Sequence, residues 1–221
     1  MDLMTGLAII CLLMVAVAFS PLGLGGGILY VPIMHYMLDW EIKEAIVASL
    51  TLVLMVSLGS SLAHSKSGHA DQRVAKWGRI AAVPSATIGV LLSGVLLSLV
   101  GDIGIKILAA LVITFVLERT IRKSVAHTVE YTEEQLLEKR NQYLAGSSSA
   151  GIAAGILGIG GGAILVTLNR SMLKMDAKKA AGTSYLVTAT IVPVALLSHL
   201  LINQNLDVIV DNSGIFAIVL V

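Results

Sequence analysis

The chain has 221 residues, of which 56% are hydrophobic and 13% charged, and its formal net charge is +1. Its mean hydropathy of +0.89 leaves too little polar surface to enclose a water-soluble core. The composition therefore excludes a soluble globular class and predicts an all-α integral membrane protein, because the long apolar runs lack the alternation of about ten-residue β-barrel segments.

The first predicted membrane helix is the apolar run 3–19, which has no Lys or Arg before it and is interpreted as a retained helix rather than a cleaved signal peptide. A glycine cluster, "PLGLGGGILYVP", follows at 21–32 and precedes a short helix expected at 28–38. Further apolar runs lie at 45–63, 80–100 and 103–117. Residues 1–118 are thus predicted to be a first transmembrane repeat.

Residues 119–143 are predicted to contain a cytoplasmic linker helix, because "EYTEEQLLEKRNQY" carries acidic residues early and basic residues late. A second transmembrane repeat is expected over 144–221. It has apolar runs at 144–168 and 180–202 and a second glycine cluster, "GILGIGGGAILV". The last run, "GIFAIVLV", is too short to span a membrane, so this repeat is expected to be incomplete at Val221.

An internal repeat relates the two units at an offset of 135 residues. Twelve identities fall within the 42 positions aligned from Gly23 to His64. The identities include both glycine clusters: Gly23, Gly25, Gly26 and Gly27 align with Gly158, Gly160, Gly161 and Gly162. Internal duplication is common in secondary transporters, whose substrate sites lie between the repeats near the bilayer midplane.

The two repeats are predicted to be inverted relative to each other. If each glycine cluster only bent one long helix, Lys and Arg would divide 9 to 6 between the two sides of the membrane. If each cluster turns the chain back as a membrane hairpin, the division becomes 13 to 2, with only Lys43 and Lys106 outside. The positive-inside rule favours the hairpins. A single helix over 3–38 would also be about 54 Å long, far more than a hydrocarbon core of about 30 Å.

Each hairpin tip is a candidate substrate site. Backbone groups that lose helical partners inside a membrane must face protein, water or a ligand. Glycine allows a positive φ and lets a ligand approach without a Cβ, and the following helix directs its first N–H groups towards the tip. Two tips predict one small-anion site, with close helix packing as the alternative explanation. The predicted glycine ligands are Gly25, Gly26, Gly27, Gly160, Gly161 and Gly162.

Polar side chains near the tips complete the predicted site. Ser49, Thr183 and Ser184 carry hydroxyls early in the helices that follow the tips. These hydroxyls are able to bind an oxyanion or, alternatively, a carbonyl of their own or a neighbouring helix. Asn169 and His35 follow the tips on the short helices and are expected to reach the same cavity or to lie at an interface.

His64 and His199 occupy equivalent positions in the repeat. Histidine exchanges a proton near neutral pH, so both are candidates for proton coupling, with an interfacial position as the alternative. The chain has one cysteine and lacks H-E-x-x-H, G-x-S-x-G and P-loop motifs. We therefore expect no catalytic residues, no metal, no cofactor and no enzymatic activity. The absence of a basic arm also argues against nucleic-acid binding.

The paired "GLGGGILYVP" and "GIGGGAILV", the segments "ASL" and "GTS" that follow, and "AHSKSGHAD" resemble the TauE/SafE sulfite/sulfonate exporter family, also called 4-toluene sulfonate uptake permeases. The resemblance covers nearly the whole chain and implies a multi-pass transporter in the plasma (inner) membrane of a prokaryote. Its implied substrates are small sulfur-containing anions such as sulfite, sulfonates, sulfoacetate or thiosulfate. An anion channel that uses the same glycine tips is the alternative. Membrane lipids are the other expected partners, and assembly into a homo-oligomer is left open.

Overall fold

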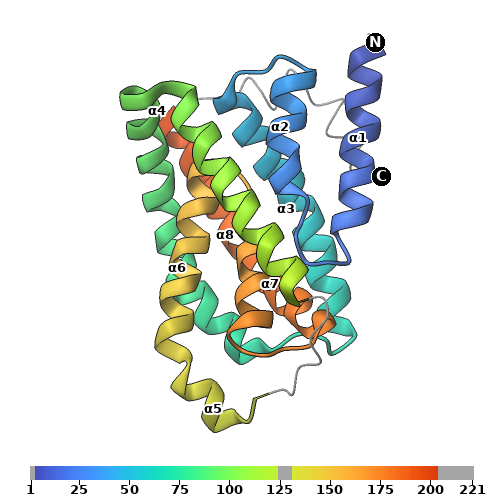
Figure 1. The fold of residues 1–221 in the computed structure, drawn as a ribbon, viewed down its shortest axis with the longest axis vertical. Coiled ribbons are helices and arrows are strands. Elements are labelled where there is room, and N and C mark those ends of the chain that lie inside the picture. The colour runs from blue at the N-terminus through green and yellow to red at the C-terminus, as the bar shows by residue number, and fades with distance from the viewer. Residues whose placement is uncertain (1–2, 124–130, 204–221) are drawn as a thin grey trace.

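A computed structural model describes residues 3–123 and 131–203, and every element within these ranges is an α-helix (Figure 1). The described helices are α1 (Leu3–Phe19), α2 (Gly27–Met37), α3 (Ile42–Lys66), α4 (Gln72–Lys123), α5 (Glu133–Glu138), α6 (Arg140–Leu157), α7 (Gly162–Ser171) and α8 (Ala177–Asn203). The prediction of an all-α chain is confirmed for this part. Part of the expected linker and the end of the second repeat, including "GIFAIVLV", lie outside the described residues.

Within the described residues, three helical segments are long and apolar enough to cross a membrane: Ile42–Lys66, Gln72–Val116 and Ala177–Ile202. The middle one is interrupted at Gly101, where φ is +65° and ψ is −163°. A positive φ is accessible to glycine without steric cost, so the chain turns there and the part of α4 after Gly101 runs back along the bundle (Figure 1). This turn separates the predicted runs 80–100 and 103–117.

Two hairpins enter the bundle from opposite ends (Figure 1). In the first, α1 runs inwards, the chain turns through the first glycine cluster, and α2 returns towards the end where α1 began. In the second, α6 enters from the other end and α7 returns to it after the second glycine cluster. Long helices α3 and α8 follow the two hairpins and pack against each other, so that both turns lie within the bundle.

The packing of α6 against the first part of α4 depends on small residues. A Cβ placed on Gly151 would contact the carbonyl group of Ala82, and one on Gly155 would contact that of Ala86. Gly89 of α4 faces Ile152 of α6 in the same way. Small residues allow two helix backbones to approach closely, which is a common basis of helix association in membranes. This interface fixes the position of the second hairpin.

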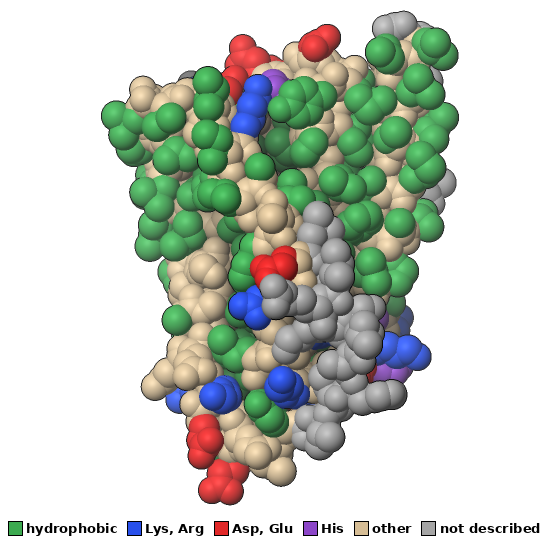
Figure 2. Space-filling model, viewed as in Figure 1, with side chains coloured by type: hydrophobic (Ala, Val, Ile, Leu, Met, Phe, Trp, Pro, Cys, Tyr) green, Lys and Arg blue, Asp and Glu red, His purple; other side chains and the backbone are tan. Residues whose placement is uncertain are grey.

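The outer surface of the bundle is strongly apolar. Large side chains such as Leu99 and Leu201 are 77% and 79% exposed. Figure 2 shows hydrophobic side chains over the upper part of one face and most of the visible Lys and Arg side chains below them. One end of the bundle holds the last residues of α3 and the first residues of α4, α6 and α8. We call this end the basic end. Lys43 and Lys106 belong to the opposite end, where α3 begins and α4 turns.

Candidate substrate site

The two glycine turns follow the same backbone path. In the first turn Gly23, Gly25 and Gly26 have φ values of +77°, +68° and +77°. Their repeat equivalents, Gly158, Gly160 and Gly161, have φ values of +69°, +70° and +75°. Gly26 and Gly161 occupy the N-cap positions of α2 and α7. Each turn therefore ends at the N-terminus of a short helix, where the first N–H groups have no partner within the helix.

The two turns meet at the centre of the bundle through the hydroxyl of Ser49. This side chain is fully buried, and its Oγ donates to the carbonyl oxygen of Gly158 in the second hairpin at 2.8 Å. The same Oγ lies 3.5 Å from the carbonyl oxygen of Gly27 in the first hairpin. A residue of α3 thus joins the N-terminus of α2 to the opposite turn.

Ser184 reproduces this arrangement from α8. Its buried Oγ donates to the carbonyl oxygen of Gly162, in its own hairpin, at 3.0 Å. The same Oγ lies 3.4 Å from the carbonyl oxygen of Gly23 in the other hairpin. These carbonyls are the repeat equivalents of the two that Ser49 contacts. In this conformation both predicted serine hydroxyls are bonded to backbone carbonyls at the contact between the hairpins.

Close contacts within the protein account for glycine at most positions of the turns. A Cβ on Gly27 would lie 2.7 Å from the carbonyl oxygen of Ile159, and one on Gly162 would lie 3.0 Å from that of Gly23. Both contacts join one hairpin to the other. Among the six predicted glycines, Gly25 has the most room, because its Cβ would meet Val53 at an ordinary 3.4 Å. The remaining short contacts involve protein neighbours of Gly26, Gly160 and Gly161 at 2.5–2.9 Å.

Two of the other predicted polar residues make structural contacts at the start of α8. Thr183 Oγ1 accepts a hydrogen bond from the backbone N–H of Asp71 at 2.9 Å, which ties α8 to the start of α4. Asn169 Nδ2 donates to the carbonyl oxygen of Ala180 at 3.0 Å. Both side chains are fully buried, and neither lines either of the two cavities beside the glycine turns that are described below.

The equivalent histidines have different surroundings. His199 is 2% exposed, and its Nε2 donates to the carbonyl oxygen of Gly155 at 2.7 Å, just before the second turn. His64 is half-buried and its ring stacks on that of Tyr185 at 5.9 Å between centroids. Tyr185 donates through its hydroxyl to the carbonyl oxygen of Ser20 at 2.6 Å, just before the first turn. Ser20 and Gly155 are repeat equivalents, so the same carbonyl is bound in both hairpins, by different residues.

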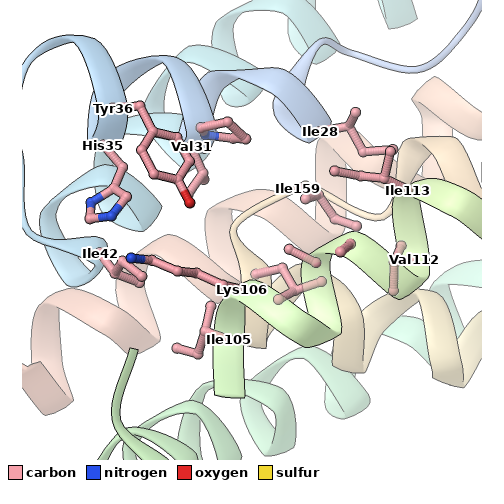
Figure 3. A pocket seen from close by; sticks show the side chains of 14 residues that line it. Ile28, Val31, His35, Tyr36, Ile42, Ile105, Lys106, Val112, Ile113 and Ile159 are labelled. Atoms are coloured by element: carbon pink, nitrogen blue, oxygen red, sulfur yellow. The ribbon is translucent and has the colours of Figure 1, made fainter. Parts of the chain in front are cut away.

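His35 lines a cavity of about 210 Å³, which we call the Lys106 cavity (Figure 3). His35 Nδ1 donates to the carbonyl oxygen of Trp40 at 2.8 Å, which fixes the ring. Lys106 comes from the part of α4 after Gly101, and its Nζ lies 5.6 Å from the centroid of the Tyr36 ring. Figure 3 shows these polar groups at one end of the cavity and Ile28 and Ile159 at the other, beside the glycine turns.

A second cavity, of about 80 Å³, lies on the other side of the turns, and we call it the Arg119 cavity. It is lined by Pro21, Leu22, Leu24, Arg119, Val166, Thr167, Arg170 and Ala177. The sequence-based site omitted Lys106, Arg119 and Arg170. Lys106 lies within the apolar run 103–117, and a lone charge in such a run is a sequence signal for a functional residue. Arg119 and Arg170 were counted only as cytoplasmic charges.

The model of the sulfite exporter TauE/SafE family matches residues 8–221. The chain is also 26% identical over 214 residues to a probable membrane transporter protein of Methanocaldococcus jannaschii, an alignment that covers 92% of this chain and 75% of that protein. No solved structure matches the chain. The family match agrees with the apolar helices and with the resemblance of the glycine clusters. The chain therefore belongs to the sulfite exporter TauE/SafE family of membrane transporters.

Proposed function

We propose that this chain is a secondary transporter that exports small sulfur-containing anions such as sulfite, sulfonates, sulfoacetate or thiosulfate. The observation that carries the proposal is the meeting of two hairpins that enter from opposite ends and contact each other through Ser49 and Ser184. Short helices that begin at a central break are a recurring way to bind a substrate in transporters, because their N-termini favour negative charge.

The proposed arrangement is an inverted repeat in the plasma membrane of a prokaryote, with the basic end in the cytoplasm. The excess of Lys and Arg at that end supports this orientation through the positive-inside rule. An anion that leaves a cell with a negative interior gains about 2.3 kcal/mol per charge for each 100 mV of potential. Export of an anion therefore needs no separate source of energy.

The proposed binding residues are the six glycines Gly25–Gly27 and Gly160–Gly162 together with the hydroxyls of Ser49 and Ser184. In the described conformation these hydroxyls donate to carbonyls of the turns. We infer that an anion binds when the two hairpins separate, because separation releases the Ser49 hydroxyl from the carbonyl of Gly158 and uncovers the N–H groups at the starts of α2 and α7. His35, Asn169 and Thr183 surround these elements and support the same site.

Proton coupling is proposed for His64 and His199. Each is next to a carbonyl-binding contact that precedes a glycine turn, either directly for His199 or through Tyr185 for His64. A change in the charge of either ring would therefore act on the end of α1 or α6, from which the turn begins.

The test is a flux measurement in proteoliposomes with labelled sulfite, thiosulfate and sulfoacetate, with sucrose as a neutral control. Each solute is measured with and without an imposed potential and pH gradient, beside protein-free liposomes. Saturable flux with counterflow of at least one sulfur anion supports the carrier. Conductance without saturation or counterflow would show that the protein is an anion channel and not a carrier. The absence of flux of all three anions would contradict the proposal.

A further inference from the structure

The two cavities beside the glycine turns are repeat equivalents of each other. Six of the eight residues that line the Arg119 cavity have their partner, at the offset of 135, in the lining of the Lys106 cavity. Three of these pairs are Leu24 with Ile159, Val31 with Val166, and His35 with Arg170. One cavity is therefore present twice, once on each side of the contact between the hairpins.

Each cavity combines two basic side chains of the same origin. One comes from the returning helix of a hairpin, namely His35 of α2 or Arg170 of α7. The other comes from the part of α4 after Gly101, namely Lys106 or Arg119. Lys106 and Arg119 are thirteen positions apart, or about 20 Å along a helix. The same helix thus provides a cation to both cavities, and Figure 1 shows it crossing the bundle in front of α8 towards α7.

We propose that the two cavities are the outer and inner ends of one anion path and that Lys106 and Arg119 bind the transported anion at these ends. This inference rests on the proposed function and adds residues that belong to neither glycine turn. The ligand is a small oxyanion, because basic side chains line each cavity. Ile28 and Ile159 line the other end of the Lys106 cavity, which therefore also accepts a short apolar substituent on the anion. Each cation brings the anion to the N-terminus of the nearby short helix.

An alternative role for Lys106 is purely structural. Its ammonium group lies over the Tyr36 ring, and a long basic side chain near a helix end often extends to the membrane surface. Arg119 is likewise 5.6 Å from the centroid of the Phe115 ring. A structural role would alter stability without regard to the side from which the anion arrives, so the side of the effect separates the two explanations.

The first experiment compares right-side-out and inside-out membrane vesicles, with labelled sulfoacetate and thiosulfate as probes. Lys106→Gln is expected to raise the half-saturating concentration at least tenfold for anion added to the outer side only. Arg119→Gln is expected to do so for the inner side only, and Lys106→Arg and Arg119→Lys are expected to restore most of the affinity. Lys43→Gln and Lys76→Gln are the matched controls, because these residues belong to the same two ends and line neither cavity.

A second experiment does not require transport. In a Cys11→Ser background, Lys106→Cys and Arg119→Cys are treated with the anionic reagent sulfonatoethyl methanethiosulfonate and with its trimethylammonium analogue. We expect Lys106→Cys to react from the outer side and Arg119→Cys from the inner side, with slower reaction when sulfoacetate is present. Reaction unaffected by sulfoacetate at both positions would overturn the inference.

The two proposals fail in different ways. Flux in the wild type with unchanged half-saturation on both sides in Lys106→Gln and Arg119→Gln would overturn the anion path and leave the transporter proposal intact. Absence of anion flux in the wild type would contradict the proposed function, and the sulfoacetate-dependent labelling would then decide the inference on its own.

Discussion

At the scale of single residues, the contact between the hairpins depends on two buried hydroxyls. Ser49 donates to the carbonyl of Gly158, at the C-terminal end of α6, where an ordinary helix leaves a carbonyl without a partner. Ser184 donates to the carbonyl of Gly162, the first residue of α7. A buried carbonyl that loses its donor costs about 1–3 kcal/mol. These serines therefore contribute to stability in the described conformation, whatever they bind in another.

Replacing either serine by alanine tests this contribution. Ser49→Ala is expected to lower the free energy of unfolding by about 1–2 kcal/mol, because the buried carbonyl of Gly158 becomes unsatisfied. Ser184→Ala is expected to lose less, about 0.5–1 kcal/mol, because the carbonyl of Gly162 also lies within α7. Thermal or denaturant unfolding in detergent micelles measures the effect. The control is Ser98→Ala, since Ser98 is exposed and bonds only within its own helix. Equal stability of Ser49→Ala and Ser98→Ala would contradict the central role of the contact.

The equivalent glycines Gly25 and Gly160 provide a matched pair. Both have positive φ values, so alanine at either position costs about 1–2 kcal/mol from the backbone alone. At Gly160 the new Cβ would also lie 2.5 Å from Val53 Cγ1, compared with 3.4 Å at Gly25. We expect Gly160→Ala to lose about 1–3 kcal/mol more than Gly25→Ala. Addition of Val53→Ala should recover part of that difference, and no recovery would mean that the clash is not the cause.

At the scale of elements, the interface of α4 with α6 holds the second hairpin in place. Its glycines bring each backbone against the other, so the second turn is positioned by the first part of α4 rather than by its own sequence. The turn at Gly101 then returns α4 across the bundle, where its later part lines both cavities. The part of α4 before Gly101 therefore packs against the second hairpin, and the part after Gly101 places Lys106 and Arg119 in the two cavities.

Gly151→Ala tests the close approach of α4 and α6. The added methyl group would contact the carbonyl of Ala82, so the helices must separate and the variant should lose at least 2 kcal/mol or fail to accumulate. Gly59→Ala is the matched control, because Gly59 lies in α3 with no atom within 4 Å of its Cβ position. That control should gain about 0.5–1 kcal/mol from helix propensity. Unfolding in detergent compares the two, and similar stabilities would disprove the tight interface.

Sequence reasoning predicted the class and the separate helices well, because these depend on composition and on spacing along the chain. It placed the serines beside the turns correctly but did not identify their carbonyl partners, which come from residues more than 100 positions away. The cavities could not be predicted for the same reason, since each combines a hairpin with a distant part of α4. Tyr185 was also missed, because its repeat equivalent is Leu50 and no local pattern marks it.

At the scale of the whole molecule, the Lys and Arg side chains gather mainly at one end of the bundle, which is the basis of the proposed orientation with the basic end in the cytoplasm. For a monovalent anion without coupled ions, a potential of 100 mV is worth about 2.3 kcal/mol, or about a 50-fold concentration ratio at equilibrium. In vesicles with a negative interior, we expect the ratio of the outside to the inside concentration of the anion to approach this value. A ratio that changes with an imposed pH gradient, and no longer does so in His64→Gln or His199→Gln, would instead establish proton coupling.

The contact between the hairpins has a consequence for the energy of exchange between two conformations. The shorter bond of Ser49 crosses to the opposite hairpin, whereas the shorter bond of Ser184 stays in its own. If each serine shifts to its other carbonyl, both hydroxyls still donate one bond, and the two halves have exchanged roles. The larger and smaller cavities would then exchange as well. The number of serine hydrogen bonds is the same in the two states, so these bonds add little to the energy difference between them, and a driving force applied from outside selects the state.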